Sequence, residues 1–235
     1  MSGSWEKSPV DVLIAHQISG WELLDYEWHE NQLNFMLNLP KELKVARMKF
    51  PEPIIDGSRE KAKNLAISNG ARWLFFCDTD LQIPPDTLQR LIAHDKDIVG
   101  GLYVRRHQPP FNEMLRFRTN GLPGIEPIRD GDYVQGSLVE CDAIATGCML
   151  IKTEVFEKIP PWKLTIDGQN ANPAHFLWTE NRLPNGMSED FAFCVRARQA
   201  GVKVFCDTSI LCRHKGPLKL LPSGNNSIQL EFSGQ

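Results

Sequence analysis

Two carboxylates follow directly after an apolar run in the stretch WLFFCDTDLQIPPDTL, residues 73–88. Asp78 and Asp80 are spaced i, i+2, so on an extended chain both side chains would project to one side and Thr79 to the other. Neighbouring carboxylates at the end of a buried strand concentrate negative charge, which costs free energy unless a cation or ligand offsets it. The pattern favours a site for a hard divalent ion such as Mg²⁺ or Mn²⁺. The alternative is a purely structural role, in which the two acids cap the helix predicted after Pro84.

Three more polar side chains stand at the borders of apolar segments. Glu189 and Asp190 follow Ser188 at the start of SEDFAFCVRARQAG. Acidic residues in a first helical turn are also favoured by the helix dipole, at about 0.3–1 kcal/mol each, so a structural role is an alternative. His214 ends the segment VKVFCDTSILCRHKG, where it is either a metal ligand or an ordinary histidine. Two cysteines nearby lack the paired spacing of a structural zinc site.

Strand and helix patterns alternate along the first half of the chain. Strands are predicted for VDVLIAH, KVARMKF, RWLFFC and DIVGGLYV. Helices are predicted for GSREKAKNLAISNG, with Ser58 as N-cap and Gly70 in the stop signal, and for PPDTLQRLIAH, with prolines in its first turn. This alternation predicts an α/β fold with a mostly parallel central sheet and helices on both faces. Ligands bind such sheets beyond the carboxyl ends of the strands, where Asp78 and Asp80 lie.

The second half is less regular. Residues 106–140 are rich in Pro and Gly and are expected to form loops or a hairpin, and CDAIATGCMLIKTEVFEKI predicts a strand followed by a short helix. Residues 160–187 show no sustained periodicity, which in a compact domain indicates a functional or mobile segment. The tail after Leu221 is expected to be poorly ordered or an edge extension. No repeat or linker divides the chain, so a single domain over 1–235 is predicted.

Composition sets the class of protein. The chain has 235 residues, 42% of them hydrophobic and 23% charged, which is typical of a globular domain with a core. The net charge of -3 argues against an extended nucleic-acid surface. No apolar run is long enough to cross a bilayer and none follows a basic start, so we expect no transmembrane segment and a soluble, cytoplasmic protein. Six cysteines without a Cys-x-x-Cys pair predict buried free thiols. The oligomeric state stays open.

The order of these motifs resembles that of the GT-A fold glycosyltransferases, most closely glycosyltransferase family 2 and relatives with a metal-binding histidine. The resemblance extends from about Val12 to Gly216 and is most specific in WLFFCDTDLQIPPDTLQRLI, ATGCMLIKTEVFEKI and SEDFAFCVRARQAGVKVFCDTSILCRHKG. It implies a nucleotide-sugar-binding half at about 10–105, an acceptor and catalytic half at about 106–216 and a tail at 217–235. The implied activity is transfer of a hexose from a UDP- or GDP-sugar to an acceptor hydroxyl, with Mn²⁺ or Mg²⁺.

The resemblance also assigns catalytic and metal-binding roles. Asp80 would hold the metal on the donor diphosphate, His214 would complete the metal site, and Asp78 would contact the nucleotide and lie close enough to be a further ligand. Asp190, with Glu189 as second choice, would face the acceptor hydroxyl and take its proton. The irregular segment before the acidic pair would be a lid that excludes water.

Nucleotide binding is assigned to a second group of residues. His16, Gln17 and Ser19 follow the first strand, where the family binds the base, and Arg59 would reach a phosphate. The family's usual acidic pair followed by Gly-Ser has its nearest match in IIDGSRE, at Asp56. Whether transfer inverts or retains the anomeric configuration stays open.

Two other functions are compatible with the same residues. A GT-A-like module could hold a nucleotide-sugar or glycan without transferring it. A phosphatase of the haloacid dehalogenase type also carries an Asp-x-Asp after a strand, with Asp78 as nucleophile and Asp80 as acid. In that family the motif follows the first strand, whereas at least one convincing strand precedes it here.

Overall fold

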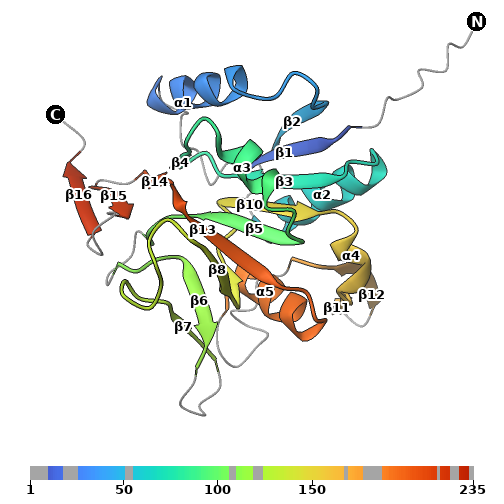
Figure 1. The fold of residues 1–235 in the computed structure, drawn as a ribbon. Helices are drawn as coiled ribbons and strands as arrows, with labels where there is room; N and C mark the ends of the chain where they lie inside the picture. The colour runs from blue at the N-terminus through green and yellow to red at the C-terminus, as the bar shows by residue number, and fades with distance from the viewer. Residues whose placement is uncertain are drawn as a thin grey trace, which may run out of the picture.

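The structure is a computed structural model that describes residues 10–17, 26–50, 55–105, 110–118, 124–166, 169–176, 187–215, 218–222 and 228–232. At its centre is a seven-stranded sheet (Figure 1). Its strands are β1 (Val12–Gln17), β2 (Val45–Phe50), β3 (Trp73–Cys77), β5 (Ile98–Leu102), β8 (Leu138–Cys141), β10 (Cys148–Lys152) and β13 (Val204–Leu211). They are arranged in the order β2-β1-β3-β10-β5-β13-β8. All four strands predicted in the first half are therefore present.

Strand direction places several strand ends at one edge of the sheet. β1 is parallel to β2 and β3, and β13 is parallel to β5. β10 is antiparallel to both β3 and β5, so these two share a direction, and β8 is antiparallel to β13. The predicted α/β class is confirmed, but the sheet is mixed, because β10 and β8 run antiparallel to the strands beside them. The carboxyl ends of β1, β3 and β5 consequently lie at the same edge.

Helices cover both faces of this sheet (Figure 1). They are α1 (Tyr26–Leu37), α2 (Ile55–Ser68), α3 (Thr87–Ala93), α4 (Val155–Lys158) and α5 (Glu189–Gln199). Neighbouring residues of β3 point to opposite faces, as the period of a strand requires. Phe75 joins the core cluster that contains Phe35 of α1 and Leu88 of α3, whereas Phe76 joins the cluster that contains Ala62 of α2 and Phe193 of α5.

Shorter strands form three smaller sheets beside the main one. They are β4 (Leu81–Gln82), β6 (Met114–Phe117), β7 (Ile125–Pro127), β9 (Ala143–Ile144), β11 (Trp162–Ile166), β12 (Gln169–Ala174), β14 (Arg213–His214), β15 (Leu218–Pro222) and β16 (Ile228–Phe232). The hairpin β11-β12 lies in the segment expected to be irregular, of which residues 167–168 and 177–186 lie outside the described part. The tail contributes β15 and β16 to a sheet with β14 and β4, which is the edge extension foreseen as one alternative.

Helix boundaries differ from the predicted ones at the amino-terminal ends. α2 begins at Ile55, so Ser58 lies inside the helix and is not its N-cap. The two prolines before α3 lie outside its first turn, since α3 begins at Thr87. The stop predicted at Gly70 is confirmed, and Gly201 follows the end of α5 in the same way. Gly70 after α2 and Gly201 after α5 have φ of 64° and 80°, the left-handed conformation that favours glycine.

The described residues agree with two expectations from composition. All six cysteines are free and buried. No helix among the described residues is both long and apolar enough to cross a membrane.

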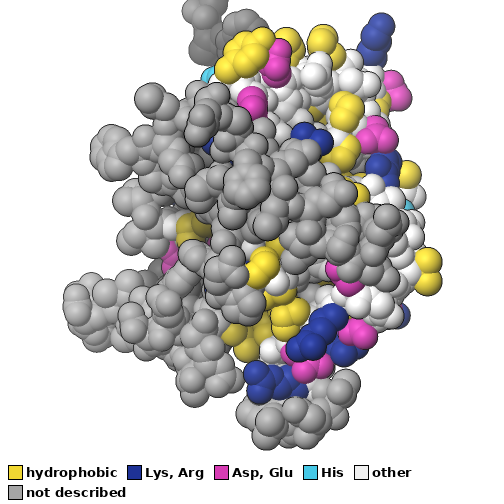
Figure 2. Space-filling view, turned by 90° about the vertical axis from the view of Figure 1, so that its left-hand side faces the viewer, with side chains coloured by type: hydrophobic (Ala, Val, Ile, Leu, Met, Phe, Trp, Pro, Cys, Tyr) yellow, Lys and Arg dark blue, Asp and Glu magenta, His cyan; other side chains and the backbone are white. Residues whose placement is uncertain are grey.

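On the face shown in Figure 2, the described basic side chains lie intermixed with acidic ones and do not form one broad basic patch. That nucleic acid is not a partner stays a prediction.

Candidate functional site

A cavity of about 270 Å³ lies at the edge of the sheet where β1, β3 and β5 end, next to the start of α5. Most of its polar lining comes from side chains far apart in the sequence. These are Gln17, Arg59, Asp78, Asp80, Tyr103, Arg105, Glu113, Ser188, Glu189, Asp190 and His214. The fold thus brings together the three polar groups that the sequence placed at the ends of apolar segments.

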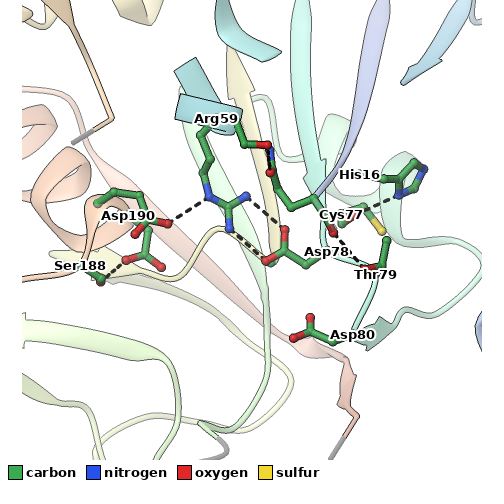
Figure 3. A network of polar contacts seen from close by, with 12 residues as sticks. His16, Arg59, Cys77, Asp78, Thr79, Asp80, Ser188 and Asp190 are labelled. Carbon is green, nitrogen blue, oxygen red and sulfur yellow. Dashed lines mark hydrogen bonds and ion pairs between the residues drawn. The ribbon is translucent and has the colours of Figure 1, made fainter. Parts of the chain in front are cut away.

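Asp78 and Asp80 lie on a turn after β3. The N–H of Asp78 donates to the carbonyl oxygen of Gly147 at 3.0 Å, and the N–H of Thr79 donates to that of Gln17 at 3.1 Å. The N–H of Leu81 donates back to the carbonyl oxygen of Asp78 at 3.3 Å, so the chain turns here, and the expected i, i+2 projection is not the reason the two acids share a site. Both carboxylates line the cavity because neighbouring strand ends hold the turn (Figure 3).

Arg59 of α2 lies buried between acidic side chains from two other elements (Figure 3). Its Nη1 and Nη2 donate to the two carboxylate oxygens of Asp78 at 3.1 and 2.9 Å, and its Nε donates to Oε1 of Glu189 at 3.2 Å. The guanidinium also lies 5.0 Å from the ring centre of Phe76. Arg59 therefore holds the two acids in place, and the phosphate contact predicted for it does not fit this arrangement. Since Arg59 occupies both oxygens of Asp78, the metal-ligand role of Asp78 fits poorly as well.

The two acids of α5 have different surroundings. Burial, reinforced by the charge of Asp190, raises the pKa of Glu189 to about 7, although Arg59 opposes the shift. Oδ1 of Asp190 accepts the N–H of Phe191 at 2.7 Å and the hydroxyl of Ser188. The serine is the residue before α5, as predicted, but its hydroxyl orients Asp190 and does not cap the helix. Of the two acids, Asp190 is the one not held by Arg59.

Asp80 and His214 form the second polar pair in the cavity. Nδ1 of His214 lies 2.8 Å from the carbonyl oxygen of Val104, which can only accept, so Nδ1 donates a hydrogen bond to it. Nε2 of the same ring faces Oδ2 of Asp80 at 3.4 Å. The imidazole is held further by an edge contact with Tyr103, whose ring centre is 5.4 Å away. An imidazole nitrogen and a carboxylate oxygen are both common metal-ligand atoms, so this pair can hold a cation.

This pair fits a divalent metal ion as a two-residue ligand set. Ligand distances of about 2.1 Å would place two neighbouring donors about 3.0–3.4 Å apart, close to the observed separation. Among the described residues, no group of three or more His, Cys, Asp or Glu side chains is arranged to hold a metal. Mg²⁺ commonly takes one or two carboxylates from a protein and fills its other positions with substrate phosphates and water. Asp80 and His214 therefore suit an ion that arrives with a phosphate ligand.

His16, predicted to contact a nucleotide base, does not line the cavity. Its Nδ1 donates to the carbonyl oxygen of Cys77 at 2.9 Å, and its Nε2 accepts from Nε of Arg47 at 2.6 Å. Burial, followed by the charge of Arg47, lowers its pKa to about 3, so the ring is neutral. The ring points away from Asp78 and Asp80 (Figure 3). His16 is thus a structural residue that joins β1 to its neighbours.

Gln17, which was also predicted to contact a nucleotide base, does line the cavity. Its Oε1 accepts from the hydroxyl of Ser58, which explains why that serine lies within α2 and faces β1. Its Nε2 is buried and has no hydrogen-bond partner among the described residues, so it can donate to a ligand. Ser19 lies outside the described residues.

Three polar side chains of the cavity were not identified from the sequence. Tyr103 and Arg105 follow the carboxyl end of β5, so the rule that found Asp78 also points to them. The hydroxyl of Tyr103 accepts the N–H of Gly147 at 2.9 Å. Glu113 lies in the Pro-rich segment before β6, and no pattern there sets it apart from a surface acid. Only the fold brings it to the cavity wall.

Gly147 lies where the turn, Tyr103 and β4 meet, and we expect Gly147→Ala to destabilise the protein. An added Cβ would lie 2.6 Å from Cδ1 of Leu81 and 2.7 Å from the hydroxyl of Tyr103. Overpacking of this kind costs about 1–3 kcal/mol of the free energy of unfolding, which urea denaturation would measure. Gly57→Ala is the control, because nothing lies within 4 Å of its added Cβ in α2. Equal stability of the two variants would contradict the expectation.

No model of a known protein family matches this sequence, and no curated protein matches it. Solved structures do. One of them, described as "Crystal Structure of A197 from STIV", superposes with a TM-score of 0.57 and covers 96% of this chain and 96% of its own. The two sequences are 15% identical, so the match shows a shared fold and nothing about activity. The described α/β architecture is therefore one that known proteins adopt.

Proposed function

We propose that this chain is a GT-A fold glycosyltransferase that uses Mn²⁺ or Mg²⁺ to move a sugar from a nucleotide-diphosphate sugar to an acceptor hydroxyl. The observation that carries the proposal is the convergence on one cavity of the Asp80–His214 pair and Asp190. These groups come from a strand-end turn, a late strand and a helix start. This transfer needs two components: a pair of side chains that bind the metal ion, and a separate carboxylate that accepts the proton.

Asp80 and His214 would hold the metal, which as a Lewis acid offsets the negative charge that develops on the leaving diphosphate. Gln17 would donate its Nε2 hydrogens to the nucleotide at the end of β1. Asp78 stays in place through Arg59, and in that position it can accept a ribose hydroxyl, which donates to a carboxylate without displacing the guanidinium. The donor would thus lie along the edge formed by β1 and β3.

Asp190 would act as the base. An acceptor hydroxyl is a weak nucleophile, and a carboxylate within hydrogen-bond reach takes its proton as the new bond forms. Two contacts already hold Oδ1 of Asp190, so its Oδ2 is the atom for this transfer. Glu189 is the poorer candidate, because Arg59 binds it and the side chain is almost fully buried.

Nucleotide binding tests the proposal directly. We expect one nucleotide or nucleotide-sugar among UDP, GDP and their sugar conjugates to raise the melting temperature when Mn²⁺ is present. At a ligand concentration a hundredfold above the dissociation constant the gain in stability is about 2.7 kcal/mol. Asp80→Ala should abolish the shift, because it removes one of the two protein ligands. Glu154→Ala, an exposed acid at α4, serves as the matched control and should keep it.

The outcomes separate the alternatives. Metal-dependent binding without transfer or hydrolysis would indicate a binding module. A shift that survives in Asp80→Ala would contradict the metal site. No shift with any nucleotide, together with hydrolysis of a simple phosphate ester, would support the phosphatase reading, in which Asp78 would need to act as nucleophile despite its two contacts with Arg59.

A further inference from the structure

Glu113 is a cavity residue that neither the proposed metal site nor the proposed base uses. It lines the same cavity as Asp190. Its Oε2 is buried and has no hydrogen-bond partner among the described residues. A buried polar atom without a partner costs about 1–3 kcal/mol, so native proteins rarely keep one unless a ligand or water completes it. The atom is therefore a candidate contact for a ligand that enters the cavity.

The backbone holds Glu113 firmly at this wall. Its N–H donates to the carbonyl oxygen of Tyr103 at 2.9 Å, and its own carbonyl oxygen accepts the N–H of Ala145 at 3.3 Å. Arg105, which also lines the cavity, donates its backbone N–H to Phe111 at 2.9 Å, and its guanidinium lies 5.2 Å from the ring centre of that residue. Glu113 is thus fixed by two neighbouring segments before any ligand binds.

The surroundings favour the protonated form of this acid. Burial, followed by the charge of Asp190, raises the pKa of Glu113 to about 8, and Arg105 opposes the shift only in part. The other titratable and charged groups that line the cavity are Arg59, Asp78, Asp80, Tyr103, Glu189 and His214. Near neutral pH the side chain can therefore both donate a hydrogen bond to a hydroxyl group and accept one from it.

We propose that Glu113 binds a second hydroxyl group of the acceptor, beside the one that faces Asp190, so that the acceptor is a compound with adjacent hydroxyl groups such as a sugar. This inference rests on the proposed function for the reacting hydroxyl, but the contact itself concerns only binding. Glu113 is a residue that positions the acceptor, whereas Asp190 takes part in the reaction. The guanidinium of Arg105 would support the same hydroxyl oxygens from the neighbouring wall.

A binding experiment with simple sugars tests the assignment. The probes are methyl α- and β-glycosides of glucose, galactose and mannose, measured by ligand-observed NMR with UDP or GDP and Mn²⁺ present. We expect at least one to bind the wild-type chain, Glu113→Ala to weaken it about tenfold, and Glu113→Gln to keep it within about threefold, because the amide still donates and accepts. Wild-type affinity should fall as pH rises above about 8, whereas that of Glu113→Gln should not. Glu126→Ala on β7 is the control, since that acid pairs with Arg116 outside the cavity.

Each result bears on the inference. Absence of binding by every glycoside to the wild-type chain, or equal affinity in wild type and Glu113→Ala, would overturn it. Unfolding curves of both variants show whether the fold is kept, and the Gln variant preserves the test if the Ala variant does not fold. Glycoside binding that depends on Glu113 without any nucleotide shift would leave this contact standing and refute the proposed transfer. A nucleotide shift lost in Asp80→Ala, with no role for Glu113, would do the reverse.

Discussion

Asp190→Asn is expected to lower the rate of sugar transfer by about 10²–10⁴-fold, the usual contribution of a positioned general base. Asparagine is nearly the same size as aspartate, and its oxygen can still accept the N–H of Phe191 and the hydroxyl of Ser188 that hold Oδ1 of Asp190. The local geometry should therefore survive while the proton acceptor is lost. The measurement is release of nucleoside diphosphate from the donor that the melting experiment identifies, with and without acceptor.

Two comparisons make the Asp190 result specific. Metal-dependent stabilisation by the nucleotide should be unchanged in Asp190→Asn, because the proposed metal ligands are Asp80 and His214. Glu189→Gln should reduce transfer much less. Glu189 is bound to Arg59, and its interaction with Asp190, the proposed base, is through charge alone. Transfer at the wild-type rate in Asp190→Asn would refute the assignment of the base. A loss as large in Glu189→Gln would move the role to that residue.

Arg59→Met is expected to lower the free energy of unfolding by about 3–5 kcal/mol, the usual cost of removing one partner from a buried ion pair. Arg59 is 2% exposed and is bound to two acids, whose side chains are 18% exposed for Asp78 and 3% for Glu189. Methionine keeps much of the side-chain volume, so the loss measures charge and hydrogen bonds more than packing. Urea denaturation of the two proteins at pH 8 gives the difference.

The pH dependence of the Arg59→Met defect has a definite sign. Without the guanidinium, burial raises the pKa of the two carboxyl groups further above their unfolded-state values. A carboxyl group with a raised pKa contributes its full stability below the unfolded pKa and loses it as pH rises through the folded pKa. The defect should therefore be smaller at pH 5 than at pH 8, and adding Asp78→Asn and Glu189→Gln should recover part of it. A defect equal at both values of pH would contradict this account.

Arg116→Met is the matched control for that experiment. Arg116 also pairs with two acids, at 3.1 Å from Glu126 and 3.1 Å from Asp132, but its side chain is 40% exposed. Solvent screens such pairs, and their loss costs about 0–1 kcal/mol. If the two arginine variants lose equal stability, burial is not what makes Arg59 important.

Local patterns predicted elements better than their ends. The apolar runs of β1, β3 and β5 identified these strands, because a strand buried on both faces is apolar throughout. Ser58 shows where local reasoning failed. A serine in that position is a common N-cap, but α2 begins earlier and the hydroxyl contacts Gln17 and the carbonyl of Phe50 instead. A tertiary contact replaced the local one, and the local sequence holds no signal for it.

The sequence by itself determined which short segments supply the proposed site residues: an acidic pair after an apolar strand, an acidic helix start and a histidine at the end of a late strand. It determined this because strand ends and helix starts are local features. Only the tertiary structure decided which partners these residues have. Arg59 binds the carboxylate of Asp78, and His214 lies beside Asp80. His16 is turned away from the cavity, whereas Glu113 lines it. Such contacts join residues separated by many positions, and they depend on how the strands are ordered in the sheet, which no local pattern encodes.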